Sequence, residues 1–458
     1  METKKKFDLE NEGKPNNVNN NNNNNNKLTK EFSPKKFLFV SFESLSGDLA
    51  WQIKKEGHEV KVFIKEESDK DVYDGFLEKV ERWEDYKDWA DVIVFDDVGF
   101  GEIADALRSE NKMVVGGSKY TDKLEEDREF GQNEMKKAGM VVLPHWDFED
   151  FDSAIDFIKA NPERYVFKPS GTISSEQKGI LFLGQEEDGK DLIEILEQNK
   201  KAWAKKIKKF QLQKRAVGVE VAVGAFFNGE DFIYPINVNF EHKKLFPGDI
   251  GPYTGEMGTL MYWSEPNVIF NTTLFKMKEE LKKSGYVGYI DLNCIANSKG
   301  IYPLEFTARF GYPTISIQME GISSEMGAFL YSLAKHEKFE LKTKRGFQVG
   351  VVVVVPPFPY EDKNEIFIYR DLSILFKKPN LEGIHLGDVK MINNVWCVAG
   401  ESGYVLVVTG SGNTVEEARK QAYNRIKNIV LQNMYYRTDI GLKWFQDSDK
   451  LQTWGYLK

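Results

Sequence analysis

Short apolar runs alternate with helical stretches between residues 36 and 115, and this alternation restricts the fold more than any other feature. Strand-like runs occupy residues 36–41, 60–64, 91–95 and 113–115, and helix-like stretches occupy 45–55 and 103–109. Strands that alternate with helices indicate parallel pairing, because each crossover returns through a helix. We therefore predict an open parallel α/β domain in residues 34–120. Its crevice should lie where the strands end, around 41–48 and 96–101.

Two further units of mixed α/β and α+β type are predicted after residue 120. In residues 121–342, helices are expected at 122–137, 151–159, 190–208, 272–284 and 322–334, and strands at 165–168, 179–183, 210–214, 219–227, 232–236, 286–296 and 301–306. In residues 343–445, four strands (347–355, 389–392, 395–398 and 405–409) precede a helix at 414–432. Thr414 and Glu417 have the spacing of a capping box at the start of that helix.

Both chain ends are expected to lie outside these units. Residues 1–33 are mostly charged or asparagine, with an unbroken asparagine run from 19 to 26. Such a segment cannot bury enough apolar surface to offset the entropy of ordering, so we predict a disordered tail. Residues 446–458 are expected to form a C-terminal tail.

The overall composition excludes several classes of protein. The net charge is −9, which argues against nucleic acid as a partner, because phosphate backbones require a concentrated basic surface. Cys294 and Cys397 lack metal-ligand spacing and are expected to be buried thiols of a cytoplasmic protein. The longest apolar run, 349–355, is too short for a membrane span, and no signal peptide is visible.

Residues 248–258, GDIGPYTGEMG, contain four glycines. Glycine lets the backbone approach a ligand closely or adopt positive φ angles. The same loop carries a threonine and two acidic residues, which suits a small, charged, phosphate-bearing ligand. A glycine-rich surface turn is an equally good interpretation from this segment alone.

Two segments have residues suited to a nucleotide. Lys168 ends a strand and precedes a Gly/Ser loop that reaches Gly179, so its ammonium and the loop amides could hold phosphates. A solvated surface lysine is the commoner occurrence at such a position. The extended segment from Gln213 to Glu220 could present backbone edges to adenine and a carboxylate to ribose, or it could be an ordinary strand pair.

Asp291 and Glu305 are acidic residues within two apolar strands joined by the turn at 297–300. Two carboxylates buried side by side repel one another unless a cation lies between them. Mg²⁺ held by one or two carboxylates and by substrate phosphates is the natural occupant, with Asn293 and Thr307 as auxiliary ligands. Arg309 follows these strands and could bind a substrate carboxylate or form a structural ion pair.

The order of these segments resembles the ATP-grasp superfamily, and within it the phosphoribosylamine–glycine ligase family. The resemblance covers about residues 36–441. Its most specific parts are EHKKLFPGDIGPYTGEMG (241–258), against the family's DHKRLxDGDxGPNTGGMG, and LEFTARFGYP (304–313), against EFNxRFGDPE. Residues 410–423 and 436–441 are similar to the family's TxxGxTxxEARxxAY and YRxDIG stretches.

The resemblance implies a two-subdomain ATP-grasp core, with a lid subdomain at about 140–214, and a small C-terminal α+β domain. It implies ATP and Mg²⁺, or Mn²⁺, as cofactors. The nucleotide would be bound by Arg128, Lys168, Lys178, Gly179, Gln213, Lys214, Arg215, Ala216 and Glu220. The metal would be bound by Glu305, Asp291, Asn293 and Thr307.

The resemblance also implies the chemistry and the other substrates. A carboxylate is activated as an acyl phosphate and then attacked by an amine, in purine biosynthesis. Lys168, Glu241 and Arg309 would be the catalytic residues, and Glu241 and Arg309 would lie near an amino acid such as glycine. Asp249, Gly251, Thr254, Gly255, Gly258 and Arg309 would contact the amino acid or the amine acceptor. A monomer or homodimer with small-molecule partners, without membrane or nucleic acid, is expected.

Several positions depart from the family pattern. The family's GGREHA stretch, which helps to hold phosphoribosylamine, corresponds to Glu43–Ala50. Other departures are Arg128 for the first nucleotide lysine, Gln213 for glutamate, Tyr253 for asparagine, Glu256 for glycine, Thr307 for asparagine and Tyr312 for aspartate. These departures leave two alternatives open: an ATP-grasp ligase that joins an amino acid or peptide to a different amine, and a non-catalytic nucleotide-binding protein.

Overall fold

A five-stranded parallel sheet forms the N-terminal part of the protein, in the order β3-β2-β1-β4-β5. In this computed structural model, residues 32–170, 180–360 and 363–458 are described; the predicted tail at 1–33 falls almost entirely outside them. The prediction of alternating parallel strands and helices is confirmed. The elements are β1 (Lys36–Ser41), α1 (Gly47–Lys55), β2 (Glu59–Ile64), β3 (Glu78–Lys79), β4 (Val92–Phe95), α2 (Gly101–Ser109) and β5 (Val114–Val115).

Two short helices, α3 (Lys119–Glu126) and α4 (Arg128–Lys137), follow where one helix over 122–137 was expected. Asp127 lies between them with extended backbone angles, and its side chain accepts a hydrogen bond from the backbone N–H of Phe130. This is the geometry of an N-cap, so Asp127 ends one helix and begins the next. The break places Arg128 in the first turn of α4.

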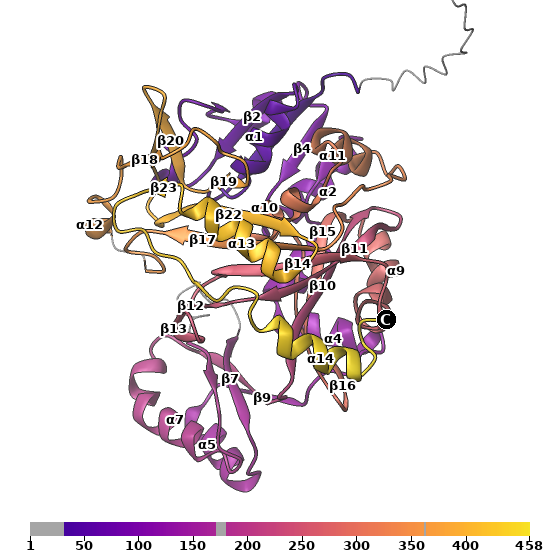
Figure 1. The fold of residues 1–458 in the computed structure, drawn as a ribbon. Helices are drawn as coiled ribbons and strands as arrows, with labels where there is room; N and C mark the ends of the chain where they lie inside the picture. Colours follow the sequence, from indigo (N-terminus) through magenta and orange to yellow (C-terminus); the bar gives the residue numbers. More distant parts are fainter. Residues whose placement is uncertain (1–31, 171–179, 361–362) are drawn as a thin grey trace, which may run out of the picture. The chain divides into compact units, whose positions relative to one another are not determined.

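A smaller four-stranded sheet, in the order β6-β9-β7-β8, forms the region predicted as the lid. It has its own hydrophobic core, centred on Phe151, Phe167, Leu196 and Phe210, separate from the main core. Figure 1 shows these elements grouped together at the lower end of the view. They are β6 (His145–Phe148), α5 (Phe151–Ala160), β7 (Tyr165–Ser170), β8 (Phe182–Leu183), α7 (Lys190–Trp203) and β9 (Lys209–Lys214).

An eight-stranded sheet is the centre of the remaining chain, in the order β16-β15-β10-β11-β14-β17-β22-β19. Strands β14 and β17 pair directly. The predicted boundary between the second and third units, at residue 343, therefore does not coincide with a break in the sheet. Its strands are β10 (Val219–Asn228), β11 (Phe232–Glu241), β14 (Gly258–Ser264), β15 (Val287–Asn297), β16 (Gly300–Thr307), β17 (Phe347–Val354), β19 (Ile384–Leu386) and β22 (Tyr404–Gly412). A separate hairpin pairs β12 (Lys244–Phe246) with β13 (Ile250–Tyr253).

The helices after residue 264 differ most from expectation. The single helix predicted at 272–284 is divided into α8 (Val268–Thr272), a 3₁₀ turn (Leu274–Met277) and α9 (Lys278–Lys283). Helix α10 (Thr314–Gly321) was not predicted, and α11 (Met326–Ala334) begins four residues later than expected. Nearly every residue of α10 is buried, so it lacks the polar stripe by which an amphipathic helix is recognised.

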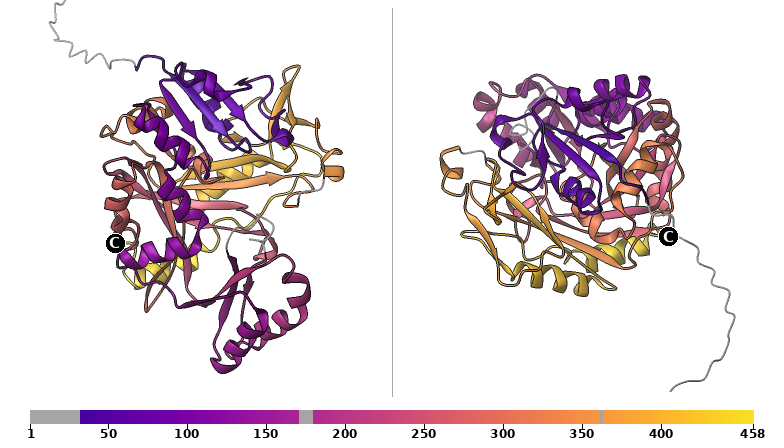
Figure 2. Two further views of the ribbon diagram at one scale, coloured as in Figure 1. Left: turned by 180° about the vertical axis from the view of Figure 1, so that it is seen from behind. Right: turned by 90° about the horizontal axis from the view of Figure 1, so that it is seen from above.

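The C-terminal residues add a small sheet and further helices. The sheet order is β20-β21-β18-β23, and its strands lie beside the N-terminal part, as the views in Figures 1 and 2 agree. The backbone N–H of Tyr73 donates to the carbonyl of Val389 across this contact. The elements are α12 (Lys363–Ile366), β18 (Ser373–Phe376), β20 (Val389–Ile392), β21 (Val395–Val398), α13 (Val415–Ile426) and β23 (Ile429–Val430).

The C-terminal tail predicted at 446–458 is largely helical in the structure. Helix α14 (Trp444–Thr453) buries Leu451 completely, and the Trp444 ring packs edge-on against Phe240. Aromatic and apolar burial offsets the entropy of ordering this segment. In the described ranges, no helix is long and apolar enough to cross a membrane. Cys294 and Cys397 are both buried and unbonded to each other, as expected.

The predicted capping box at the start of α13 is present. The Thr414 hydroxyl accepts from the Glu417 N–H at 3.2 Å, and the Glu417 carboxylate accepts from the Thr414 N–H. We expect Thr414→Ala to lower the free energy of unfolding by about 1 kcal/mol, because the Glu417 N–H in the first turn of the helix loses its acceptor. Urea denaturation measures this change. Asn424→Ala, at an exposed position within the same helix, should cause no loss; equal stability of Thr414→Ala and the wild type would contradict the assignment.

Candidate active site

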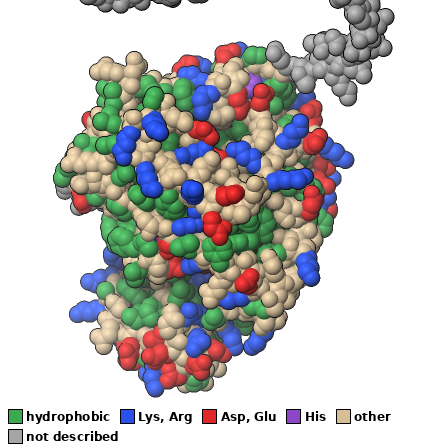
Figure 3. Space-filling model, in the orientation of Figure 1, with side chains coloured by type: hydrophobic (Ala, Val, Ile, Leu, Met, Phe, Trp, Pro, Cys, Tyr) green, Lys and Arg blue, Asp and Glu red, His purple; other side chains and the backbone are tan. Residues whose placement is uncertain are grey.

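A cleft of about 2060 Å³ is lined by residues of the lid sheet and of the eight-stranded sheet. It is large enough for a nucleotide together with two small substrates, because sites for one small ligand usually measure about 300–1,000 Å³. On the face seen in Figure 3, basic and acidic side chains are interspersed. Fourteen of the predicted site residues line the cleft: Arg128, Lys168, Gln213, Lys214, Arg215, Ala216, Glu220, Glu241, Thr254, Gly255, Asp291, Glu305, Thr307 and Arg309.

Lys168 is the cation that the lid sheet directs into the cleft. Strand β7 places it opposite Gln211 of β9, and its ammonium donates to the Gln213 side-chain oxygen at 2.8 Å. Burial, followed by the positive charge of Arg128, lowers the pKa of Lys168 to about 7. A cation desolvated in this way gains strongly from an anionic ligand. Lys178 and Gly179, predicted to join it, lie outside the described residues.

The end of β9 supplies the other residues predicted to face the nucleotide. Lys214 forms an ion pair with Glu163 at 2.6 Å, and the Arg215 guanidinium donates to the Gly184 carbonyl at 2.6 Å. Their side chains are therefore held within the lid, while Ala216 leaves the adjoining backbone uncovered by a bulky side chain. These contacts suit residues that shape a base-binding wall more than residues that carry charge to phosphates.

The strand pair β15–β16 carries the four predicted metal ligands on one face, in a register that differs from expectation. Asp291 lies opposite Thr307 and Asn293 opposite Glu305, so the two acids are diagonal neighbours instead of a direct pair. Asp291 is 3% exposed, whereas half of the Glu305 side chain is exposed. The expectation that both carboxylates are buried side by side is therefore wrong for Glu305, because β16 forms the outer edge of the sheet.

These residues fit Mg²⁺. Asn293 donates its amide N–H to Glu220 and Glu241, which leaves its buried Oδ1 without a hydrogen-bond partner in the described chain. Asn293 is not among the residues that line the cleft, but a buried amide oxygen without a partner, on the sheet face that carries Asp291 and Glu305, is typical of a hard-cation site. In residues 32–170, 180–360 and 363–458, no group of three His, Cys, Asp or Glu side chains could hold a metal alone. Mg²⁺ usually completes its shell with phosphate oxygens and water, so a small protein ligand set is sufficient.

Lys243 is a site residue that the sequence did not single out. Its ammonium lies 3.1 Å from Glu220, 3.4 Å from Glu241 and 3.6 Å from Glu305. Burial opposes its charge, but the three carboxylates together raise the pKa of Lys243 well above its usual value. The alternation of Glu241 and Lys243 along the chain was the available signal, because residues two apart in an extended segment share a face.

Arg309 lines the cleft but is already engaged by two acids. Its Nε lies 3.0 Å from Asp97 at the end of β4, and its Nη2 lies 3.1 Å from Glu125 of α3. Neither acid was predicted, because both come from segments about two hundred residues earlier in the chain. The sequence left two roles open for Arg309, a structural ion pair or a contact with the substrate. Both are compatible, because two acids that hold one side of the guanidinium can orient its other side toward the cleft.

The glycine-rich loop divides into an anchored part and a cleft-lining part. Thr254 and Gly255 line the cleft, whereas Asp249, Gly251 and Gly258 are not among its lining residues. Asp249 instead accepts a hydrogen bond from the fully buried Arg437 at 3.1 Å. The substrate contacts of Asp249, Gly251 and Gly258 stay predictions. The structure gives Asp249 a structural role, because its carboxylate is bound to Arg437.

Arg437 also forms a bidentate pair with Asp439, at 2.8 and 2.7 Å, and the Gly248 N–H donates to the same carboxylate. Burial alone would raise the pKa of Asp439, but these hydrogen bonds and the Arg437 charge lower it to about 2. A carboxyl whose folded-state pKa is depressed adds stability above its unfolded pKa and loses it as the pH falls through the folded value.

We therefore expect Asp439→Asn to be less stable than the wild type by about 2 kcal/mol at pH 7. The difference should close between about pH 4 and pH 2, where the wild-type carboxyl takes up its proton. Urea denaturation at a series of pH values measures this difference. A pH-independent difference would mean that lost packing, and not charge, determines the effect.

The first strand–helix turn, Glu43–Ala50, is occupied by the protein's own contacts. The Ser46 N–H and hydroxyl both donate to the buried Asp96 carboxylate, at 3.1 and 2.7 Å. Burial raises the pKa of Asp96 to about 7, partly offset by these hydrogen bonds. The start of α1 thus has an internal carboxylate where an external anion would otherwise bind.

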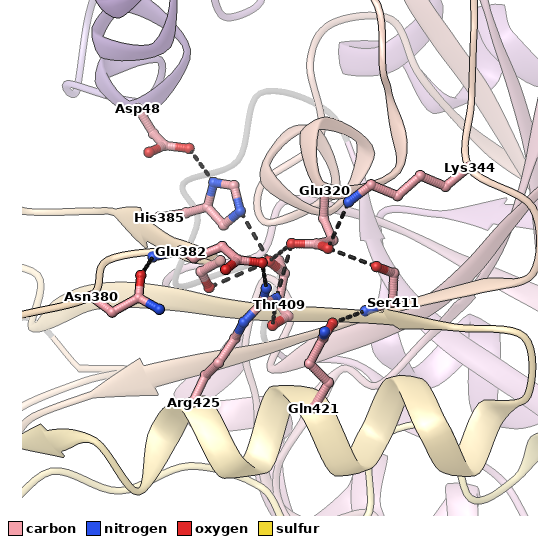
Figure 4. A network of polar contacts seen from close by, with 11 residues as sticks. Asp48, Glu320, Lys344, Asn380, Glu382, His385, Thr409, Ser411, Gln421 and Arg425 are labelled. Atoms are coloured by element: carbon pink, nitrogen blue, oxygen red, sulfur yellow. Dashed lines mark hydrogen bonds and ion pairs between the residues drawn. The ribbon is translucent and has the colours of Figure 1, made fainter. Parts of the chain in front are cut away.

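Asp48, in the first turn of α1, joins a polar network that extends to helix α13 (Figure 4). It accepts from the Leu386 N–H at 3.0 Å and lies 2.7 Å from the His385 ring. The network continues through Thr409 and Glu320 to Arg425 of α13. The N-terminal part is therefore fixed against the eight-stranded sheet by hydrogen bonds as well as by the shared core.

Comparison with known proteins assigns these features to one family. The phosphoribosylglycinamide synthetase ATP-grasp (A) domain matches residues 126–315, and the C domain of the same synthetase matches residues 348–443. Two curated relatives are the phosphoribosylamine–glycine ligases of Listeria innocua and Clostridium acetobutylicum. Each is 26% identical, over 354 and 359 residues respectively, and each match covers 74% of this chain and 81% of the relative.

Solved structures show the same fold. The phosphoribosylamine–glycine ligase of Thermotoga maritima aligns with a TM-score of 0.65 and 22% identity, over 89% of this chain and all of the other. A biotin carboxylase from Campylobacter jejuni aligns with a TM-score of 0.58 and 13% identity, over 93% and 97% of the two chains. The two domain matches are in the expected order and together cover more than half of the chain, so this protein belongs to the phosphoribosylglycinamide synthetase family of ATP-grasp proteins.

Proposed function

We propose that this protein is an ATP-dependent ligase that joins glycine to phosphoribosylamine, giving glycinamide ribonucleotide, ADP and phosphate. The names of its relatives support this reaction, which would place the protein in purine biosynthesis in the cytoplasm. The observation that carries the proposal is the cleft, which has the lid cation Lys168 on one wall and the carboxylates of β15–β16 on another.

The residues of the cleft account for the nucleotide half of the reaction. Lys168 would neutralise phosphate charge, while Gln213–Ala216 and Glu220 would position adenine and ribose. Asp291 and Glu305 would hold Mg²⁺ or Mn²⁺, with Asn293 and Thr307 as further oxygen donors. When bound, the metal supplies neutralisation of the negative charge on the phosphates. Positioning and charge stabilisation are the main contributions a protein makes to phosphoryl transfer.

The bonds change in two steps. A carboxylate oxygen of the amino acid attacks the γ-phosphorus of ATP, the bond to the β-phosphate oxygen breaks, and ADP leaves. The acceptor nitrogen then attacks the acyl carbon, loses a proton, and displaces inorganic phosphate. Arg309 would orient the carboxylate for the first step, and Glu241 would lie beside the amine of the same substrate.

A phosphate-release assay tests the proposal. Release should require ATP, Mg²⁺, glycine and freshly generated phosphoribosylamine together, and omission of any one should abolish it. Nucleotide binding without turnover under any combination would support a non-catalytic role and overturn the proposal. The mass in solution, measured by light scattering, tests whether the protein is a monomer or a homodimer.

One observation favours a second candidate, a ligase with a different amine acceptor. The turn that replaces the family's GGREHA stretch is engaged with Asp96 and His385, so it offers few free groups to a phosphoribosyl moiety. A panel of primary amines in the same assay would identify such an acceptor. Phosphate release with another amine and none with phosphoribosylamine would select this candidate.

A further inference from the structure

Glu256 is a buried acid at a position where the family pattern has glycine. It lies between β13 and β14, lines the cleft, and is 8% exposed. Its Oε1 atom is buried and has no hydrogen-bond partner in the described parts of the chain. A buried polar atom without a partner is costly, so a site that retains one usually presents it to a ligand.

Two other buried carboxyls, Glu241 and Asp291, lie on the same wall of the cleft and act electrostatically on Glu256. We call Glu241, Glu256 and Asp291 the acid wall. Lys243 is the cation that acts on Glu256 from within the structure, but its ammonium is already shared among Glu220, Glu241 and Glu305. Burial, followed by the charge of Glu241, raises the pKa of Glu256 well above its usual value, so a cation bound beside it would stabilise the carboxylate form.

This charge balance selects the chemistry of a ligand at the acid wall. Carboxylate oxygens accept hydrogen bonds, and a primary ammonium group offers three N–H donors with a positive charge. A phosphate or carboxylate placed beside these three acids would meet further acceptor oxygens and like charge. A group bearing an ammonium is the complementary ligand.

The position of the acid wall indicates which substrate carries this ammonium group. Arg309, which would orient the substrate carboxylate, acts electrostatically on Asp291, so the acid wall adjoins the place where that carboxylate would meet the phosphoryl donor. In an α-amino acid, a single carbon separates the carboxylate from the ammonium. An α-amino acid with its carboxylate at that place therefore has its ammonium close to the acid wall.

We propose that Glu256 binds the ammonium group of the amino-acid substrate and makes the site selective for an α-amino acid over a simple carboxylic acid. This inference rests on the proposed ligase function. It concerns the donor substrate and is independent of which amine is the acceptor. Glycine satisfies it, and acetate, which lacks the ammonium, does not.

The experiment uses hydroxylamine to trap the acyl phosphate, so that no acceptor is needed. The wild type should form glycine hydroxamate in preference to acetohydroxamate. Glu256→Gln should raise KM for glycine by about 10–100-fold, as expected for loss of a charged hydrogen bond, and should leave KM for ATP unchanged. Selectivity for glycine over acetate should fall by a similar factor. Glu265→Gln, at an exposed position just after β14, is the matched control and should behave as the wild type.

A binding measurement separates failure of this inference from failure of the ligase function. Glycine is titrated calorimetrically into the wild type and into Glu256→Gln, each saturated with a non-hydrolysable ATP analogue. Weaker glycine binding by the variant supports the inference even if no hydroxamate forms, in which case only the ligase function fails. Equal binding, absence of binding by the wild type, or a change confined to the Mg²⁺ requirement overturns it. Glu256→Gly, which restores the family residue, provides a second variant if the glutamine variant does not fold.

Discussion

We expect Glu305→Gln to lower the rate of acyl-phosphate formation by on the order of 100–1,000-fold, the loss that follows when one charge-stabilising group is removed from a reaction centre. Glu305 lies between two cations, 3.8 Å from Arg128 and 3.6 Å from Lys243. It is on the same face of the sheet as Asp291 of the neighbouring strand. Glutamine keeps the shape but removes the negative charge needed to hold a divalent cation against these neighbours. The measurement is hydroxamate formation at saturating ATP and glycine.

The control for this prediction is Glu230→Gln. Glu230 forms an ion pair with Lys282 at the β10–β11 turn and does not line the cleft. Its loss should leave the rate within about twofold, because exposed ion pairs contribute little. If Glu305→Gln retains wild-type activity and an unchanged Mg²⁺ requirement, Glu305 is not a metal ligand. Weakened binding of the nucleotide without metal would instead indicate that Glu305 acts mainly by orienting Arg128.

The fold was predictable where the local pattern and the tertiary environment agree. Strand β1 is a continuous apolar run because both faces of a parallel sheet are covered, and the Asn228–Gly229 turn directly specifies the β10–β11 hairpin. Helix α10 was missed because burial on all sides removes the amphipathic period. The break at Asp127 was missed because one capping aspartate within a charged helix resembles an ordinary surface residue.

The candidate site was predictable only in part, for a different reason. Motifs marked Glu241, Asp291, Glu305 and Arg309, because each lies in a segment with a distinctive local sequence. The groups that set their charge state come from elsewhere in the chain: Glu125 and Asp97 hold Arg309, and Lys243 compensates three carboxylates. Such pairings follow from strand register and helix packing, which no local sequence pattern records.

Arg437 provides the second large effect, on stability. Its side chain is 0% exposed and donates to Asp439, Asp249 and the Lys244 carbonyl. We expect Arg437→Met to lower the free energy of unfolding by about 3–5 kcal/mol, because two carboxylates are left near a desolvated region without their shared cation. Methionine preserves much of the buried volume, so the loss reports on charge and hydrogen bonding more than on a cavity. Urea denaturation, followed by tryptophan fluorescence, measures the change.

Lys443→Met is the matched control, since Lys443 pairs with the same Asp249 but is half exposed. It should cost less than about 1 kcal/mol, as exposed ion pairs do.

Because Arg437 fixes the base of the glycine-rich loop that carries Thr254, Gly255 and Glu256, the Arg437 variant should also raise KM for glycine at temperatures where it remains folded. A stability loss as small as that of Lys443→Met would show that the loop is held by packing alone. A large loss with an unchanged KM for glycine would show that the cleft-lining half of the loop is positioned independently of its anchored half.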